Sequence, residues 1–373
     1  MPNLKQKILI LYPYAYEERD AVSAMVRELT AMLGEHNNVV LLALKVDRKL
    51  RPRRKTLDQW IYLAKALGYS VARCRDIDAI IAIDVPTGVR LVGVLPRFLS
   101  GNRIVNVSWV LDMYSNQVSR LQTGLLPRNR VVEFWDNLGL RASNHIVVLG
   151  QCMAEAVKRV SSQDAIVIPI WKEPSVTGEN LRERFGLRDD QFVLIYAGTA
   201  GSNHPMAALI EAVGSVENDN AVLLVAGRGS EVRKAREIVK GAGFSNVQFV
   251  DLVEDYEVPA LHATADLHVA ILDERVTGTC VPSKAYAAMA AGRACLFLGS
   301  DKSQVALDIA AADAGTTVRT TDVKAIADEL KTYISTPGLA ARRGQNGAQF
   351  ISEQRSLAVS TTRWERLFPK PAQ

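Results

Sequence analysis

The sequence predicts an α/β protein made of two Rossmann-like, doubly wound domains that face a cleft. Short apolar runs alternate with amphipathic stretches along the chain, and the alternation restarts after a proline-bounded connector at 169–175. Strands that alternate with helices indicate βαβ units and a parallel sheet. A chain of 373 residues is long for one core and sufficient for two. We expect domains at 1–170 and 171–350, followed by a C-terminal helix within 351–373 that packs back on the first domain.

The first half contains apolar runs of strand length separated by stretches with helical spacing. The helix that follows the first run is clearly bounded, because apolar residues recur at helical spacing and Gly34 ends it. The expected strands are 8–11, 39–44, 79–83, 104–110 and 146–149, with a short run at 165–168, and the expected helices are 20–33, 57–67 and 153–160.

The second half repeats this alternation and ends its expected core with the strand 294–298. The last expected helix begins at Pro282 and ends at Gly292, the residue types that favour a helix start and a helix end. The other expected strands are 192–197, 222–226, 247–250 and 267–272, and the other expected helices are 181–185, 205–213, 231–242 and 258–265.

Composition indicates a globular protein of the cytoplasm. Apolar residues make up 48% and charged residues 23% of the chain, which excludes broad disorder. The chain shows no apolar run of the roughly 18 residues that a membrane span needs, and the apolar run after the N-terminus is too short for a signal peptide. The four cysteines, Cys74, Cys152, Cys280 and Cys295, form no CxxC pair, so we expect neither disulfides nor a metal site.

Positive charge is concentrated in the first half. Residues 1–173 carry 24 Lys and Arg against 16 Asp and Glu, and many of them lie in the segment Arg48 to Lys55. This segment is either a solvated loop or a surface that meets phosphate, such as an anionic membrane leaflet or a lipid-linked molecule. Nucleic acid is disfavoured as a partner, because no aromatic residues interleave the basic ones. If the second interpretation holds, we expect the protein to bind peripherally to the inner face of the membrane.

The helix that begins at Pro282 is the strongest candidate for a binding site. The first turn of a helix presents backbone N–H groups without intrahelical partners and a partial positive charge. Ser283 and Lys284 lie in that turn. This arrangement fits a cradle for a diphosphate, and it also fits an ordinary capped helix with a solvated lysine.

Two glycine-containing turns follow consecutive strands in the second half. Gly198 and Gly201 follow the first, and Gly227 and Gly229 follow the next. Such glycines let a backbone approach a ligand closely, although tight turns also use glycine for structure alone. The third glycine of a dinucleotide fingerprint is missing, since position 232 is valine, so an NAD-dependent dehydrogenase is disfavoured.

In their order along the chain, these motifs resemble the donor-binding domain of GT-B glycosyltransferases. The likeness rests on Tyr196-Ala197-Gly198, Gly227, Gly229, Val281-Pro282-Ser283-Lys284, Leu261-His262-Ala263-Thr264-Ala265-Asp266 and Ala290-Ala291-Gly292-Arg293. It covers roughly 192–298 and is closest to the family 4 type, in the branch that assembles exopolysaccharide, O-antigen and colanic acid. The N-terminal half is similar mainly in layout.

The resemblance implies a transfer of a hexose or related sugar, with retention, from a nucleoside-diphosphate sugar to a cell-surface polysaccharide or lipid-linked acceptor. The first domain would bind the acceptor and the second the donor. Lys284 and Arg275 would neutralise the departing phosphate, and backbone at Leu252 and Val253 would meet the base. No metal or other cofactor is expected. The remaining expected donor residues are Gly198, Thr199, Gly201, Thr279, Val281 and Ser283.

One departure from the family pattern leaves an alternative function open. Relatives carry a Glu-x7-Glu pair, and here those positions are Thr279 and Ala287. Asp273 or Glu274 could serve the sugar instead, and His204 could act as a phosphate ligand. Loss of the pair also fits a non-catalytic GT-B protein that acts as a partner or scaffold.

Asp112 is the candidate catalytic residue of the first half. It ends an expected strand whose carboxyl end should point into the cleft, and similar glycosyltransferases have an aspartate there that faces the acceptor. The other reading is an aspartate that caps the next helix. Tyr12, Tyr14 and Tyr16 occupy the place of a glycine-containing loop in relatives, where they could stack on a sugar ring or only pack.

Overall fold

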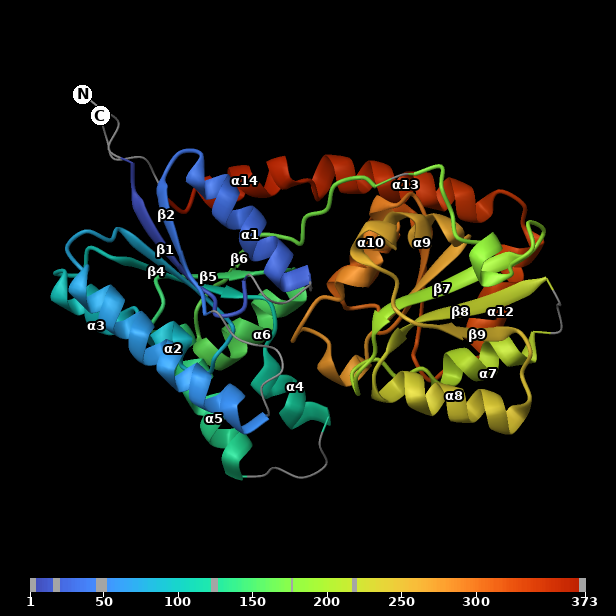
Figure 1. Ribbon diagram of the computed structural model, residues 1–373, viewed down its shortest axis with the longest axis horizontal. Coiled ribbons are helices and arrows are strands. Elements are labelled where there is room, and N and C mark those ends of the chain that lie inside the picture. The colour runs from blue at the N-terminus through green and yellow to red at the C-terminus, as the bar shows by residue number, and fades with distance from the viewer. Residues whose placement is uncertain are drawn as a thin grey trace. The chain divides into compact units, whose positions relative to one another are not determined.

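A computed structural model describes residues 5–15, 21–44, 52–121, 127–175, 177–216 and 220–368. The chain divides into two compact units, which are drawn in Figure 1. The first unit consists of Met1–Pro169, Gly278–Cys280 and Ser360–Gln373, and the second of Ile170–Thr277 and Val281–Val359. The division at 169/170 lies one residue from the boundary expected from the sequence. The short segment Gly278–Cys280 was expected in the second domain but belongs to the first unit.

The first unit is built on a six-stranded sheet with strand order β2-β1-β3-β4-β5-β6, in which every pairing is parallel. Parallel sheets are covered on both faces, which explains why the central strands read as continuous apolar runs. The strands are β1 (Lys7–Leu11), β2 (Asn38–Leu42), β3 (Ala79–Ile83), β4 (Val105–Val110), β5 (His145–Val148) and β6 (Ile166–Val167).

The helices of the first unit are more numerous than the sequence analysis expects. α1 (Ala21–Gly34) matches the helix expected at 20–33 except at its two ends, and α2 (Pro52–Ala72) and α6 (Gln151–Ser161) contain the other two expected helices and extend beyond them. Three further helices, α3 (Val94–Leu99), α4 (Tyr114–Leu121) and α5 (Pro127–Arg141), were not predicted. α3 and α5 expose several large apolar side chains, so their patterns do not mark a buried face, whereas α4 buries polar residues such as Ser115 and Asn116.

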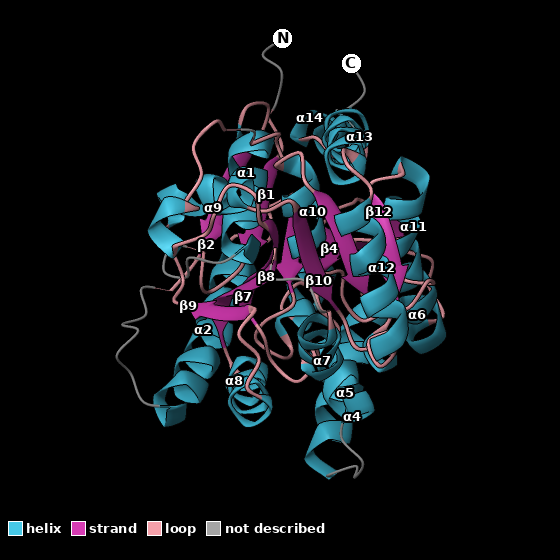
Figure 2. Cartoon of the chain, turned by 90° about the vertical axis from the view of Figure 1, so that its right-hand side faces the viewer, coloured by secondary structure: helices cyan, strands magenta, loops and turns pink. Residues whose placement is uncertain are grey.

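The second unit has its own six-stranded parallel sheet, with the order β12-β11-β10-β7-β8-β9. Leu194 and Tyr196 belong to one apolar cluster and Val193 and Ile195 to another, so helices and loops cover both faces of the sheet. In Figure 2 the strands lie between helices, as a doubly wound domain requires. Its strands are β7 (Phe192–Thr199), β8 (Ala221–Arg228), β9 (Val247–Val250), β10 (Leu267–Ile271), β11 (Ala294–Leu298) and β12 (Gly315–Val318).

The last strand of this sheet was not predicted from the sequence. The predicted core ends at β11, whereas β12 pairs with β11 as an edge strand of only four residues, three of them half-buried. The segment expected to be a helix at 181–185 is a 3₁₀ turn over Glu183–Phe185. The helices are α7 (Ala207–Ser215), α8 (Ser230–Ala242), α9 (Val258–Thr264), α10 (Ser283–Ala290), α11 (Gln304–Ala312), α12 (Val323–Ser335) and α13 (Leu339–Gln354).

The C-terminal segment is shared between the units. α13 belongs to the second unit, whereas α14 (Leu357–Glu365) runs into the segment from Ser360 onward that belongs to the first. In the first unit, Trp364 packs edge-on against Trp109 of β4, with ring centroids 5.3 Å apart. Both indoles are fully buried, and Phe368 is also buried. This contact ties the chain end to the centre of the first sheet.

Candidate functional site

The end of β7 and the start of α10 lie together in the second unit. Gly198 has a φ of 112°, and a Cβ atom built on it would lie 3.0 Å from Cε of Lys284. The ammonium group of Lys284 also lies 5.6 Å from the centroid of the Tyr196 ring. The structure therefore brings together Gly198 and Lys284, two residues that the sequence analysis names separately as donor ligands. The backbone conformation at 198 favours glycine, and a side chain there would displace the end of the lysine side chain by a few tenths of an ångström.

The second glycine pair supports the first loop. A Cβ atom on Gly227 would lie 2.3 Å from the carbonyl oxygen of Gly198, and one on Gly229 would lie 2.1 Å from that of Ala200. Gly229 also has a φ of 128°. Gly227 lets the end of β8 approach the end of β7, and Gly229 lets the β8–α8 connection pack against the loop after β7, so their role in the structure is close backbone packing.

His204 lies in the same loop and is neutral. Its backbone N–H donates to the carbonyl of Gly201 at 2.9 Å. Burial, reinforced by the nearby charge of Lys284, lowers the pKa of the imidazole to about 3. Its Nδ1 has no hydrogen-bond partner among the described residues. His204 can therefore offer a ligand a hydrogen bond but no positive charge.

A cluster of buried polar side chains anchors α10 in the second unit. The Tyr286 hydroxyl donates to Oδ2 of Asp308 at 2.5 Å, and Arg355 forms an ion pair with the same carboxylate. These contacts fix the helix while Pro282 occupies the N-cap and offers no side-chain cap. The candidate diphosphate site that the sequence predicts consists of the backbone N–H groups of this first turn and Lys284.

The half-buried face of α10 includes position 287, where the family resemblance implies a glutamate. Ser283, Lys284 and Ala287 are all half-buried, whereas Ala285 and Tyr286 are buried. Residues 283 and 287 are one turn apart and so share a face. A carboxylate at 287 would stand beside Ser283, and this chain has a methyl group there instead.

Both acidic residues of the loop between β10 and α10 bind other groups of the protein. Asp273 accepts hydrogen bonds from Nε of Arg275 at 2.9 Å and from Nη2 at 2.6 Å. Glu274 accepts the backbone N–H of Thr320 at 2.8 Å and its hydroxyl at 2.6 Å. Both carboxylates therefore have structural partners, which weakens the expectation that either replaces the missing glutamate. Arg275 remains exposed, with its charge compensated by Asp273.

The other expected donor residues lie in three places. Thr199 ends β7 and is exposed, and Gly201 follows it in the loop. Leu252 is exposed after β9, whereas Val253 packs against the cluster on one face of the second sheet. Val281 is buried, and Thr279 is buried in the first unit, where its carbonyl accepts the N–H of Met113 at 2.7 Å.

A cavity of about 260 Å³ opens in the first unit at the ends of β3 and β4. Its walls carry three carboxylates and one guanidinium, from Asp84, Asp112, Asp136 and Arg90, and two tyrosines, Tyr12 and Tyr114. Arg90 pairs with Asp84 at 2.8 Å and approaches Asp136 at 3.8 Å. Its Nε has no hydrogen-bond partner within the described part of the chain. The cavity therefore combines hydrogen-bond donors and acceptors with aromatic surface.

Asp84 is the member of this cavity that the sequence analysis misses. Its carboxylate accepts the backbone N–H groups of Leu111 and Asp112 at 2.9 and 2.8 Å. Burial raises its pKa to about 7, although Arg90 and the two N–H donors oppose the rise. It immediately follows β3, as Asp112 follows β4, so the argument from strand ends that identified Asp112 applies to Asp84 as well.

Asp112 is buried within the same cavity. Its Oδ1 accepts a hydrogen bond from Nε2 of Gln117 at 3.0 Å, and burial raises its pKa to about 6. Its backbone forms an antiparallel bridge with Cys280. The side chain therefore binds a residue of α4 from within the cavity and keeps a second carboxylate oxygen for other contacts.

Comparison with known proteins identifies the domain in the second unit. Residues 178–350 match the family described as glycosyl transferases group 1, and the matched segment lies almost entirely in the second unit. The second unit therefore carries a glycosyl transferases group 1 domain, and the two doubly wound units have the GT-B fold that the sequence predicts. Over 167 residues it is 22% identical to the colanic acid biosynthesis glycosyl transferase WcaI of Escherichia coli (strain K12), covering 42% of this chain and 41% of WcaI. The chain thus matches less than half the length of this curated relative.

Solved structures match the fold over nearly the whole chain. Sucrose-phosphate synthase from Thermosynechococcus elongatus has a TM-score of 0.78 at 16% identity and covers 98% of both chains. WaaG, a glycosyltransferase involved in lipopolysaccharide biosynthesis, has a TM-score of 0.70 at 15% identity, over 97% of this chain and 99% of WaaG. HepE of Anabaena, in complex with UDP and glucose, has a TM-score of 0.71 at 15% identity with the same coverage. Identities this low show the shared fold alone.

Proposed function

We propose that this chain transfers a hexose or related sugar from a nucleoside-diphosphate sugar to a saccharide or lipid-linked acceptor of the cell surface. The observation that carries the proposal is the contact between Gly198 and Lys284, at the end of β7 and the start of α10. Open α/β sheets bind ligands at the carboxyl ends of their strands, and a helix N-terminus beside a lysine favours a diphosphate.

The second unit would supply the charge that stabilises the leaving group. The first-turn N–H groups of α10 and the ammonium of Lys284 would face the diphosphate, with His204 as a neutral hydrogen-bond partner. Preorganised groups of this kind contribute several kcal/mol to a transition state in which negative charge develops. Under this proposal the departing diphosphate also guides the incoming hydroxyl, giving retention of configuration without a metal ion.

The cavity of the first unit is our candidate for the acceptor site. Asp112 would accept a hydrogen bond from an acceptor hydroxyl, and Tyr12 and Tyr114 would offer surfaces for a sugar ring. WaaG acts in lipopolysaccharide biosynthesis, and WcaI in colanic acid biosynthesis. Both names support an acceptor from a cell-surface polysaccharide and the family 4 branch inferred from the sequence.

The second candidate function is a non-catalytic partner or scaffold. Ala287 favours it, because a methyl group lies on the face of α10 where relatives present a glutamate to the donor ribose. The two functions differ in one property, since a scaffold that has lost the donor site would bind no nucleotide.

Calorimetric titration with UDP, GDP and their glucose and mannose conjugates tests the proposal. We expect one of the two nucleotides to bind, and Lys284→Ala to weaken its binding about tenfold or more. Lys331→Ala, an exposed lysine on α12, is the matched control and should bind as the wild type does. If no nucleotide binds the folded wild-type protein, the transferase proposal fails and the scaffold remains. Repeating the titration with EDTA tests the proposed independence from metal ions.

The cytoplasmic face of a membrane is the proposed place of action. Within the described residues, no helix is both long and apolar enough to cross a bilayer. Of the segment Arg48 to Lys55, residues 48–51 and the side chains of 52–55 lie outside the described part of the chain, so its contact with a membrane stays a prediction from sequence.

A further inference from the structure

A separate cavity, of about 490 Å³, opens in the first unit beside the edge of its sheet. It lies between β6, the edge strand, and the end of α14. Small-molecule pockets measure about 300–1,000 Å³, a range that includes this cavity. None of its lining residues lines the cavity that we propose for the acceptor, so the two are distinct. The lining residues are His145, Ile166, Val167, Arg363, Arg366 and Leu367.

The charged groups of this cavity are two arginines that have no acidic partner among the described residues. Arg363 donates a hydrogen bond from Nη1 to the carbonyl oxygen of Val167 at 3.3 Å, which leaves Nε and Nη2 for other contacts. Arg366 is exposed and forms no hydrogen bond or ion pair with the described part of the chain. The intervening Glu365 lies 3.8 Å from His36 instead. Because two like charges on one cavity wall repel each other, the cavity favours an anion.

The two arginines are held on one side of the chain at the end of α14. The backbone N–H of Leu367 donates to the carbonyl of Trp364 at 3.0 Å, so the chain continues past α14 in a turn of the 3₁₀ type. Side chains three residues apart in such a turn lie on the same side. Trp364, which is buried against β4, holds this turn on the first sheet. Arg363 and Arg366 therefore line the cavity from one anchored segment.

The other walls of the cavity are an imidazole and aliphatic side chains. His145, the first residue of β5, is half-buried, and its ring forms no hydrogen bond to the described residues. An imidazole can donate a hydrogen bond to an anion. Ile166, which is 37% exposed, and Leu367 give the cavity an apolar part. A ligand that matches these walls combines an anionic group with an apolar one.

We propose that this cavity binds a phosphate monoester of a small organic molecule. The phosphate binds Arg363, Arg366 and His145, and the organic group packs on the aliphatic walls. A phosphate monoester carries a charge of about −1.5 to −2 at pH 7 and three acceptor oxygens, which match two guanidinium groups and one imidazole. A carboxylate has a single charge and two oxygens, so it satisfies fewer of these donors. Inorganic phosphate would leave the apolar walls in contact with water.

This site lies outside the proposed transfer reaction. His145 begins β5, whereas Asp84 and Asp112 follow the ends of β3 and β4, and the candidate donor groups belong to the second unit. Ester binding can be measured without donor or acceptor. Failure of the transferase proposal would therefore leave this inference intact, and the reverse also holds.

Calorimetry and thermal unfolding with phenyl phosphate test the site in the full chain. We expect phenyl phosphate to bind about tenfold or more tightly than inorganic phosphate or phenylacetate, and to raise the temperature of unfolding as its concentration increases. Phenol, which lacks the anionic group, should not bind. Ile166→Ser should weaken the binding of phenyl phosphate and leave that of inorganic phosphate unchanged, because only the apolar wall is altered.

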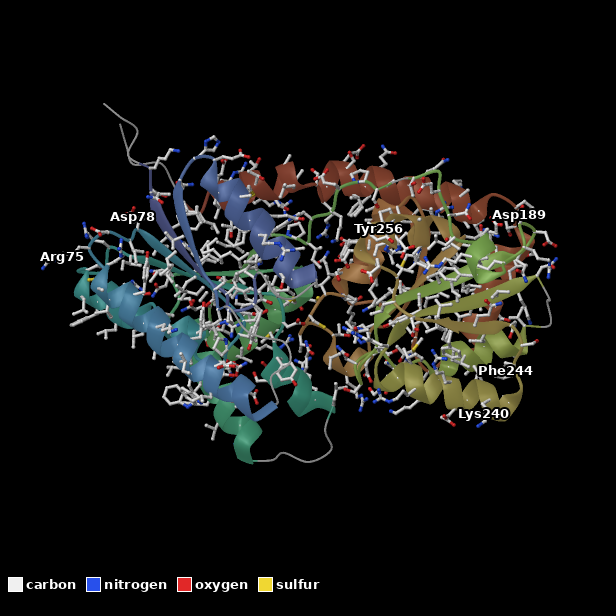
Figure 3. All side chains as sticks on the ribbon, viewed as in Figure 1. Arg75, Asp78, Asp189, Lys240, Phe244 and Tyr256 are labelled. Carbon is white, nitrogen blue, oxygen red and sulfur yellow. The ribbon has the colours of Figure 1, made fainter. Side chains whose placement is uncertain are left out.

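Variants of the arginines separate this site from the candidate diphosphate site. Arg366→Gln removes no described contact of the protein and should weaken the binding of phenyl phosphate about tenfold. Arg363→Gln combined with Arg366→Gln should weaken it further. Arg75→Gln is the matched control, because Arg75 is an exposed arginine of the first unit, labelled in Figure 3, that does not line the cavity. Both Arg75→Gln and Lys284→Ala should bind phenyl phosphate as the wild type does.

Three results would overturn the proposal. The first is absence of phenyl phosphate binding to the folded wild-type protein. The second is unchanged affinity in the arginine variants, or loss of binding in Lys284→Ala, which would assign the probe to the second unit. The third is equal affinity for phenylacetate and phenyl phosphate, which would show that the cavity does not select a phosphate group.

Discussion

The carboxylate of Asp84 accepts the backbone N–H of Asp112 at 2.8 Å, so the end of β3 directly holds the end of β4. Asp84 also accepts the N–H of Leu111 at 2.9 Å and pairs with Arg90 at 2.8 Å. The two aspartates line one cavity, and the charge of Asp112 contributes to the raised pKa of Asp84. The position and the ionisation of Asp112 are therefore linked to those of Asp84.

Replacing Asp84 with alanine should destabilise the first unit by about 3 kcal/mol, because buried Arg90 would lose its nearer partner and keep only Asp136, at 3.8 Å. Asp76→Ala is the matched control: its carboxylate is largely exposed and lies 3.9 Å from Lys7, so its loss should cost less than about 0.5 kcal/mol. Urea denaturation of both variants measures the difference. Equal costs would contradict the structural role assigned to Asp84.

The transfer rate should depend on the ionisation of Asp112. Its raised pKa of about 6 means that the carboxylate is protonated below that pH and ionised above it. An ionised carboxylate accepts a hydrogen bond from a sugar hydroxyl more strongly, so we expect the rate with saturating donor to rise through about pH 6 and then level off. Asp112→Asn should abolish this rise and lower the rate about 100-fold. Asp164→Asn, an exposed aspartate, should keep the wild-type profile, and an Asp112→Asn profile with the same rise would refute the assignment.

The sheets could be predicted because their central strands are buried on both faces. Residues 79–83 are all buried and were predicted at the same bounds as β3. The edge strand β12 escaped prediction because its sequence, Gly-Thr-Thr-Val, is too short and too polar to signal burial. α5 escaped because exposed Phe134 and Trp135 disturb the pattern that normally marks an inward face.

The candidate site could be predicted only where neighbours in space follow from topology. Strand ends and helix starts meet at one edge of a parallel sheet, which is why Gly198 and Lys284 could both be proposed from sequence. The pairing of Glu274 with Thr320 joins residues 46 positions apart through side-chain contacts, and no local pattern encodes it. The burial and ion pairing of Asp84 likewise depend on the packed structure.

Gly198→Ala should weaken nucleotide binding more than it affects folding. The new Cβ atom would lie 3.0 Å from Cε of Lys284 and would displace the lysine stem. Gly243→Ala is the matched control, because Gly243 also has a positive φ, of 71°, but has open space around it. Both variants should lose about 1–2 kcal/mol of stability from the left-handed conformation. Only Gly198→Ala should lose about tenfold in affinity for UDP or GDP, and equal affinities in the two variants would exclude a binding role for this contact.

Trp364→Ala should be among the most destabilising single changes in the first unit. The indole is fully buried and packs edge-on against Trp109 at 5.3 Å between centroids, so its removal leaves a large cavity. We expect a loss of about 3–5 kcal/mol in the free energy of unfolding. Trp60→Ala removes the same side chain from an exposed position and should change stability by less than about 0.5 kcal/mol. Comparable losses in the two variants would show that the C-terminal segment is not anchored as described.

The pair His262 and His268 should make the second unit less stable as the pH falls below 6.5. The two rings lie 3.1 Å apart, from Nδ1 of His262 to Nε2 of His268, and are buried between α9 and β10. Burial lowers the pKa of His262 to about 4 and that of His268 well below its usual value. Between pH 6.5 and about 4 the unfolded chain therefore binds protons that the folded chain does not, so the free energy of unfolding decreases as the pH falls.

For His262 alone this decrease should amount to about 2–3 kcal/mol over that range. The double variant His262→Gln with His268→Gln should flatten this part of the stability curve, whatever its cost at pH 8, when both proteins are unfolded with urea at several pH values. His36→Gln, which replaces an exposed histidine of the first unit, serves as the control. A slope in the double variant equal to that of the wild type would mean that the buried rings do not titrate with unfolding, and that other groups cause the loss of stability at low pH.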